Sequence, residues 1–268
     1  MPIEVSTAIQ TISQDQYHQI DRQVLGIAFD IHNKYGRLLE EGFYKSELQK
    51  RCSHLGLQVT REQLIRVRHG HFTKDYFIDV WFEKSIVFEC KCAQSITPSH
   101  RGQTLNYLLL TETHHGSLIN FRPLKVKREF VSTQLTHELR RKFTVSIHNT
   151  DEESVFQRLM DVAVAFCSDV GLGLDLPLYR QAFMTLNGGP FIKPQSVPII
   201  SGDQVVYEHS MNLLTQDIGL AVTALPTIAE TRLHLQRLLN NTLLAGIVWV
   251  NLPLNELRFE FLRQNHVG

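Results

Sequence analysis

The sequence predicts a mixed α/β fold, built as a tandem duplication of one domain. Segments with helical spacing of apolar residues are followed by short apolar runs that suit strands, and this order occurs twice along the chain. The 268 residues are enough for two small domains, and 43% of them are hydrophobic, so each domain can form a core. We therefore expect a mixed central sheet flanked by helices in each half.

The elements of the first half follow from the spacing of apolar residues. Val24, Ile27 and Ile31 fall on one face of a helix over residues 20–35, which ends at Gly36. The segments that follow alternate between helical and strand patterns. We expect a helix over 40–55, strands near 57–67, over 75–82 and over 86–92, a helix over 99–114, and strands over 116–121 and 125–131.

A repeat of about 133 residues relates the two halves. Tyr44 recurs as Tyr179, 135 positions later, and Glu129 recurs as Glu260, 131 positions later. Between them, "GSLINF" corresponds to "GIVWVNL" in the same order. The second half therefore predicts the same succession of elements: helices over 154–169 and 175–186, strands within 204–225, a helix over 229–244 and a strand over 246–252.

The repeat also sets the expected domain boundaries. We expect an N-terminal tail over 1–15, a first domain over 16–135 and a second copy over 153–268. The stretch between the copies, "THELRRKFTVSIHNTDEE", is polar and reads as a linker over 136–152 or an extra helix. The two copies would pack against each other as an intramolecular pseudo-dimer.

Charge and composition narrow the class of protein. The net charge is zero, but residues 1–150 carry 20 Lys and Arg against 15 Asp and Glu, and residues 151–268 carry 7 against 12. The first half therefore suits an anionic partner. We expect no membrane partner, because no apolar run approaches the roughly 20 residues of a membrane helix. The scattered cysteines and the N-terminus, which does not resemble a signal peptide, predict a cytoplasmic protein.

The apolar hairpin "FIDVWFEKSIVFECKC" carries charged residues on one face. If its turn centres on Lys84, Asp79 lies opposite Glu89, and Lys91 shares their face because side chains alternate along a strand. Asp79, Glu89 and the backbone carbonyl of Cys90 would form an oxygen site for Mg²⁺ or Mn²⁺. Lys91 could then orient or deprotonate a water, or stabilise a phosphate. The alternative is an ordinary salt-bridged hairpin.

Residues 20–132 resemble the GxxExxY protein family, a branch of the PD-(D/E)XK nuclease superfamily with a restriction-endonuclease-like fold. The resemblance rests on "IHNKYGRLLEEGFY", on the D-x9-E-x-K spacing within "DYFIDVWFEKSIVFECKC", on "SHRGQTLNYLLLT" and on "GSLINFRPLKVKREFV". Glu41 and Tyr44 occupy the positions that name the family, whereas Leu38 replaces its glycine.

The resemblance implies roles for further residues. Glu41 would be another acid ligand or support the ligands, and Gln103 would contact Lys91 or a phosphate; the alternative for Glu41 is a solvated acid at a helix start. The side chains that could contact nucleic acid are Tyr44, His100, Tyr107, Lys125, Lys127 and Arg128. His100 could instead belong to the start of its helix, and the basic strand could merely discourage aggregation.

The second copy lacks the acidic residues. Leu176 stands where Glu41 stands in the first, and "GLAVTAL" has neither acid nor lysine. The resemblance thus implies a Mg²⁺-dependent nuclease that hydrolyses phosphodiester bonds with its N-terminal copy, with DNA favoured over RNA, beside an inactive second copy. The alternatives are a non-catalytic nucleic-acid-binding or scaffold protein, and another phosphate chemistry at the same site.

Overall fold

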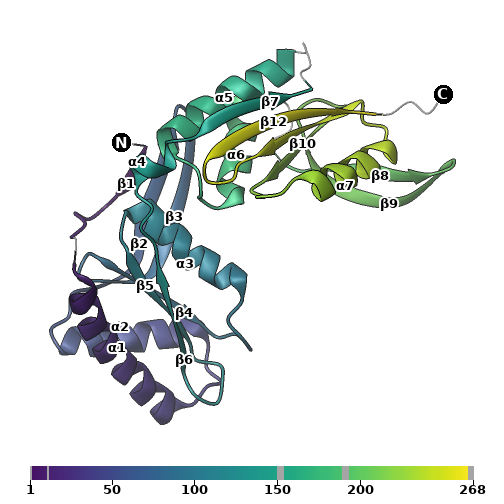
Figure 1. The fold of residues 1–268 in the computed structure, drawn as a ribbon. Helices are drawn as coiled ribbons and strands as arrows, with labels where there is room; N and C mark the ends of the chain where they lie inside the picture. Colours follow the sequence, from purple (N-terminus) through teal and green to yellow (C-terminus); the bar gives the residue numbers. More distant parts are fainter. Residues whose placement is uncertain (1, 11, 150–153, 189–192, 265–268) are drawn as a thin grey trace. The chain divides into compact units, whose positions relative to one another are not determined.

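The computed structural model describes residues 2–10, 12–149, 154–188 and 193–264 (Figure 1). Its contacts divide the chain into two compact units. The first comprises the chain up to Arg68 together with Thr73–His137, and the second comprises His69–Phe72 together with the chain from Glu138 onward. Among the described residues, no helix combines the length and hydropathy needed to cross a bilayer.

The first unit contains a six-stranded sheet among its described residues, in the order β1-β2-β3-β4-β5-β6. The pairs β1–β2, β3–β4 and β5–β6 are antiparallel, and β4–β5 is parallel. The parallel pair requires a crossover, which α3 provides. The elements are β1 (Ile3–Val5), α1 (Gln14–Tyr35), α2 (Glu41–His54), β2 (Val59–His69), β3 (Phe72–Phe82), β4 (Ile86–Lys91), α3 (Pro98–Thr111), β5 (His115–Asn120) and β6 (Lys127–Ser132).

The core of the first unit lies between the α1–α2 pair and one face of the sheet. Figure 1 shows α1 and α2 side by side, and their apolar faces contribute Val24 and Leu48 to the core. On the strands, Val80, Phe88 and Cys90 face this core. Because strand side chains alternate, the residues next to them in sequence face the opposite side, where α3 packs against β4, β5 and β6.

Capping residues fix the ends of the helices that frame the site. The Ser13 side chain accepts from the backbone of Gln16, so α1 begins at Gln14, six positions before the expected start. Gly36 ends α1 with φ of 74°, a left-handed conformation that glycine adopts without strain. Thr97 caps α3 in the same way as Ser13 caps α1.

The second unit holds another six-stranded sheet among its described residues, in the order β7-β12-β11-β10-β9-β8. Here β10–β11 and β12–β7 are parallel, whereas β8–β9, β9–β10 and β11–β12 are antiparallel. Its elements are α4 (His137–Arg140), β7 (Thr144–His148), α5 (Ser154–Val170), α6 (Leu176–Asn187), β8 (Gln195–Ser201), β9 (Gln204–Leu213), β10 (Ile218–Thr223), α7 (Ala229–Asn240), β11 (Gly246–Asn251) and β12 (Glu256–Arg263).

The two sheets with their flanking helices confirm the predicted mixed α/β class, but two segments differ from expectation. The stretch over 1–15, expected as a tail, contributes β1 to the sheet and contains the start of α1. The stretch over 136–152, expected as a linker or a helix, contains both α4 and β7, and β7 pairs with β12 through five residues. Residues 150–153, where the expected linker meets the second copy, lie outside the described residues.

Candidate functional site

The β3–β4 hairpin brings two acids opposite each other. The chain reverses over three residues centred on Lys84, and the register pairs Val80 with Phe88. Continued one step further from the turn, this register sets Asp79 against Glu89, on the face that looks away from the α1–α2 core, and the charge of Asp79 acts on Glu89. This is the arrangement that the spacing predicted.

The two carboxylates have different partners. Asp79 accepts from the backbone N–H of Cys90, with 3.2 Å between Oδ2 and the nitrogen, and its Oδ1 lies 2.6 Å from Lys45 Nζ. Glu89 is fully buried, and its Oε1 lies 2.6 Å from Lys91 Nζ. The Oε2 atom of Glu89 is buried and has no hydrogen-bond partner among the described residues. This buried oxygen therefore keeps acceptor capacity beside Asp79.

The pKa of Glu89 reflects this environment. Burial raises it most, because a buried carboxylate loses its hydration, and the nearby charge of Asp79 raises it further. Lys91 offsets part of the effect, and the pKa of Glu89 stands at about 8. A second cation beside Asp79 and Glu89 would favour the ionised form, as a divalent ion does in carboxylate sites.

Lys45 is a member of the site that the sequence reasoning missed. It lies on α2 one turn after Glu41, and its Nζ is 2.7 Å from Glu41 Oε1 and 2.6 Å from Asp79 Oδ1. Burial lowers the pKa of Lys45, but its bonds to Asp79 and Glu41 outweigh burial, so the pKa is raised overall. The i, i+4 spacing of Glu41 and Lys45 was a visible signal, whereas the bond to Asp79 joins residues 34 positions apart.

Helix α3 carries two of the predicted residues, Gln103 and Tyr107. The Gln103 amide donates to the Tyr107 hydroxyl over 3.2 Å. Burial raises the pKa of Tyr107 to about 12, and the charges of Glu89 and Asp79 add to this effect. Tyr107 thus lies within electrostatic range of both acids. Gln103 is exposed one turn before it, at the edge of the same helix face.

Three predicted nucleic-acid contacts have other roles in the structure. Tyr44 is fully buried, and its hydroxyl bonds to the backbone of the turn before α2, so it has no surface to offer a ligand. His100 forms part of the capping box of α3 with Thr97, which matches the alternative of a residue at the helix start. Arg128 points inward and donates to Asp21 over 2.6 Å.

Arg128 is part of a buried polar network that the sequence did not reveal. The Tyr17 hydroxyl lies 2.7 Å from Ser117 Oγ and 3.3 Å from Asp21 Oδ1, and Arg128 donates to both Tyr17 and Asp21. Burial raises the pKa of Tyr17 to about 12. Lys125 and Lys127, in contrast, are exposed as predicted for a basic strand edge.

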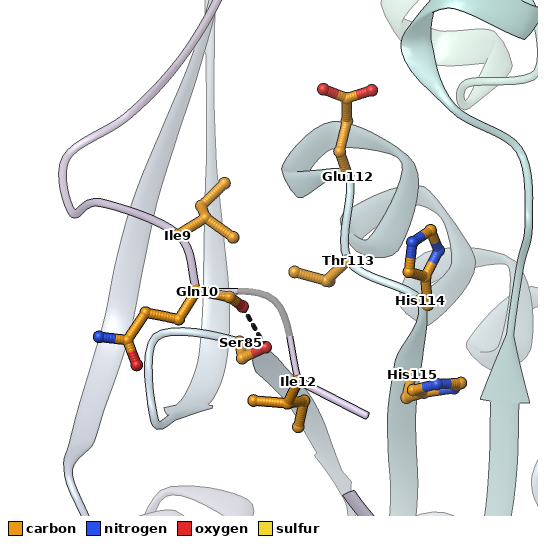
Figure 2. Close-up of a pocket in the computed structure, with 8 residues that line it drawn as sticks. All are labelled: Ile9, Gln10, Ile12, Ser85, Glu112, Thr113, His114 and His115. Atoms are coloured by element: carbon orange, nitrogen blue, oxygen red, sulfur yellow. Dashed lines mark hydrogen bonds between the residues drawn. The ribbon is translucent and has the colours of Figure 1, made fainter. Parts of the chain in front are cut away.

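A pocket lies away from the carboxylates (Figure 2). Ser85 precedes β4 and His115 begins β5, whereas Glu89 lies near the opposite end of β4. The pocket is therefore separate from the Asp79–Glu89 pair. It is lined by Ile9, Gln10, Ile12, Ser85, Glu112, Thr113, His114 and His115.

The donor set suits a hard divalent cation at the Asp79–Glu89 pair. No cluster of three or more His, Cys, Asp or Glu side chains is arranged for a metal in the part of the chain that the structure describes. Two opposed carboxylates nevertheless supply oxygen ligands of the kind Mg²⁺ prefers, and such ions usually keep several waters. Glu41 lies beside them through Lys45, which is bonded to both Glu41 Oε1 and Asp79 Oδ1.

Comparison with known proteins assigns a family to the first unit. A comparison with curated proteins and one with solved structures gave no match. Residues 18–133 match the family model described as the PD-(D/E)XK nuclease superfamily, and this range contains Asp79, Glu89 and Lys91. Residues 18–133 are therefore a PD-(D/E)XK nuclease superfamily domain.

Proposed function

We propose that the first unit is a nuclease that depends on Mg²⁺ or Mn²⁺ and hydrolyses phosphodiester bonds of nucleic acid, DNA in preference to RNA. The observation that carries the proposal is the opposed pair of Asp79 and Glu89. Lys91 is bonded to one oxygen of Glu89, and the other oxygen is buried without a partner among the described residues. The superfamily match of residues 18–133 supports the same chemistry.

Each side chain of the proposed centre would have its own role in the hydrolysis. Asp79 and Glu89, together with the backbone carbonyl of Cys90, would hold the ion. When bound, the ion would supply positive charge to the phosphate and an acidified water. Lys91, held by Glu89 at 2.6 Å, is placed to orient that water or to donate to a phosphate oxygen. Gln103 is exposed on α3 and bonded to Tyr107, and it would donate to the nucleic-acid backbone.

We also propose that the domain belongs to the GxxExxY branch and that the second unit is a degenerate copy of it. Strands β8 to β12 follow one another in their sheet as β2 to β6 do, with the parallel pair in the same place. Tyr44 donates to Gly36 over 2.7 Å and Tyr179 donates to Gly171 over 2.7 Å, each eight residues back.

A second shared motif aligns the two sheets residue by residue. The side-chain amide of Asn120 accepts from the backbone N–H of Ala93 and donates to the carbonyl of the same residue. Asn251 makes the same two hydrogen bonds with Leu225. Asn120 pairs with Lys91 on β4, and Asn251 correspondingly pairs with Thr223 on β10. Two independent hydrogen-bond motifs at matching positions favour a duplication over chance similarity.

This alignment supports an inactive second unit. Ala221 and Thr223 stand on β10 where Glu89 and Lys91 stand on β4. The register between β9 and β10 pairs Leu220 with Asn212, and continued by one residue it sets Met211 against Ala221, at the position that corresponds to Asp79. A methionine and an alanine offer no hard ligand, so we assign cation binding to the first unit alone.

Calorimetric titration with Mn²⁺ and Mg²⁺ tests the proposal. Wild type is compared with Asp79→Ala and Glu89→Ala, both checked for folding, and with Asp75→Ala, which removes an acid of the same strand that forms an ion pair with Arg66. Binding should be lost in the first two variants and kept in Asp75→Ala. Cation-dependent cleavage of single- and double-stranded DNA and RNA should follow the same pattern. Cation binding that survives both site substitutions would contradict the proposed centre.

The alternative is a non-catalytic nucleic-acid-binding protein of the same fold. One observation favours it: Lys45 already supplies a positive charge to Asp79 and Glu41, so these acids are satisfied without an added ion. Salt-dependent binding of oligonucleotides without cleavage at any concentration of Mg²⁺ or Mn²⁺ would select this alternative.

A further inference from the structure

Lys45 lies in the site, but the proposed nuclease chemistry gives it no role. We infer that the Lys45 ammonium is a resident cation that competes with the divalent ion for Asp79 and Glu41, so that the ion binds only when Lys45 leaves. This inference rests on the proposed function, because Asp79 is also a ligand of the proposed metal centre and Glu41 lies beside it through Lys45.

The contacts of Lys45 resemble those of a small cation. Its Nζ lies within 2.7 Å of carboxylate oxygens from two different elements, Glu41 on α2 and Asp79 on β3. The Lys45 side chain is only 16% exposed. It is thus enclosed between the two acids and neutralises the repulsion that they would otherwise have with each other.

Asp79 leaves little room for a second cation while Lys45 is in place. Its Oδ2 accepts from the Cys90 amide at 3.2 Å, and its Oδ1 accepts from Lys45 at 2.6 Å. A divalent ion at Asp79 would therefore share Oδ1 with an ammonium group, and two positive charges at such a distance repel each other. One of the two must leave the carboxylate.

Glu89 offers the ion a further oxygen ligand. Glu89 is fully buried, and its Oε2 has no partner among the described residues, although Lys91 holds the other oxygen. An ion that takes the place of Lys45 at Asp79 could then also contact this oxygen, which has no protein partner to give up. The four-carbon stem of lysine can turn toward solvent, so the displacement needs no movement of the backbone.

Substitution of Lys45 tests the competition directly. Mn²⁺ is titrated calorimetrically into the full chain as wild type, Lys45→Met, Lys45→Gln and Lys50→Met. Lys50 is an exposed lysine on the same helix, so the last variant removes the same charge without touching the acids. We expect both Lys45 variants to bind Mn²⁺ at least about ten-fold more tightly than wild type, equivalent to about 1.4 kcal/mol. Lys50→Met should bind as wild type does.

Thermal unfolding gives a second readout that does not depend on catalysis. Without metal, the Lys45 variants should melt below wild type because Asp79 and Glu41 lose their shared cation. Saturating Mn²⁺ should raise their melting temperature by more than it raises that of wild type. Lys45→Gln, which keeps a polar end, serves if Lys45→Met does not fold.

The outcomes separate this inference from the proposed function. Equal affinity of wild type and the Lys45 variants overturns the competition but leaves the metal centre intact. Weaker binding by the variants also overturns it and makes Lys45 a positioning residue for the acids. Binding by the variants alone supports the competition and removes support for a metal-dependent wild type. Absence of binding in every protein overturns both.

Discussion

The hydroxyl of Tyr44 donates to the carbonyl of Gly36 over 2.7 Å and closes the turn between α1 and α2. The same hydroxyl accepts from the backbone N–H of Leu39 at 3.3 Å, and the ring stacks on Phe121 with centroids 4.5 Å apart. The turn immediately precedes Glu41, the first residue of α2. This tyrosine therefore holds the chain that presents Glu41 to the site, although it has no exposed surface of its own.

Tyr44→Phe should destabilise the first unit without changing its affinity for nucleic acid. The carbonyl of Gly36 and the amide of Leu39 would lose their partner, and we expect the free energy of unfolding to fall by about 1–2 kcal/mol. Urea unfolding measures this loss, and Tyr179→Phe is the matched change in the second unit. A lower oligonucleotide affinity with unchanged stability would show instead that Tyr44 contacts the ligand.

The sequence predicted the parts of the fold that local patterns specify. The helix that contains Val24 and the hairpin centred on Lys84 appear where apolar periodicity places them. Periodicity carries less information for β1, which is three residues long, and for β7, which is held by pairing with the distant β12. Strand β8 was not expected, because Pro198 weakens the strand pattern of its sequence. This proline is tolerated because β8 lies at the edge of the sheet, where its missing N–H leaves no strand unpaired.

The candidate site shows the same division between local and distant information. The opposition of Asp79 and Glu89 follows from the length of one turn, so spacing was sufficient. The bond from Lys45 to Asp79 and the bond from Arg128 to Asp21 depend on how separate elements pack. These last two residues are 107 positions apart, and no pattern in a single sequence marks such a pair.

Ionisation of Glu89 should make the metal-free protein less stable as the pH rises. The folded-state pKa of about 8 is raised above the ordinary value of 4.5 by burial first, so the folded state holds its proton more tightly than the unfolded chain. The stability that this proton provides is full below about pH 4.5 and is lost as the pH rises through 8. Between pH 7 and pH 9 the loss should be about 1 kcal/mol.

Glu89→Gln isolates this effect, because the amide does not titrate. Urea unfolding in the presence of a chelator, at several pH values from 7 to 9, should give a smaller loss for Glu89→Gln than for wild type. Glu62→Gln, a change at an exposed position on β2, should follow wild type. Parallel pH profiles for wild type and Glu89→Gln would rule out a raised pKa for Glu89.

Arg128→Met should act on stability rather than on nucleic-acid binding. The substitution leaves the buried carboxylate of Asp21 without its cation and removes a donor to Tyr17, so we expect a loss of about 3 kcal/mol. The double variant Asp21→Asn/Arg128→Met should recover part of that loss, since no uncompensated charge remains. Denaturant unfolding measures both values. A marginal loss of stability together with weaker oligonucleotide binding would show instead that Arg128 contacts nucleic acid.

Lys125→Ala/Lys127→Ala should weaken nucleic-acid binding while leaving stability close to that of wild type. Both lysines are exposed around the start of β6, and a lysine that neutralises a phosphate contributes to the salt dependence of duplex binding. If both lysines bind phosphates, the slope of log K against log salt should fall in magnitude by about 1.8 in the double variant. Fluorescence anisotropy with a labelled duplex, in chelator so that no cleavage occurs, gives this slope.

Lys34→Ala/Lys50→Ala removes two exposed charges from α1 and α2 and controls for net charge. Equal slopes for the two double variants would mean that general charge, rather than this strand edge, attracts the nucleic acid.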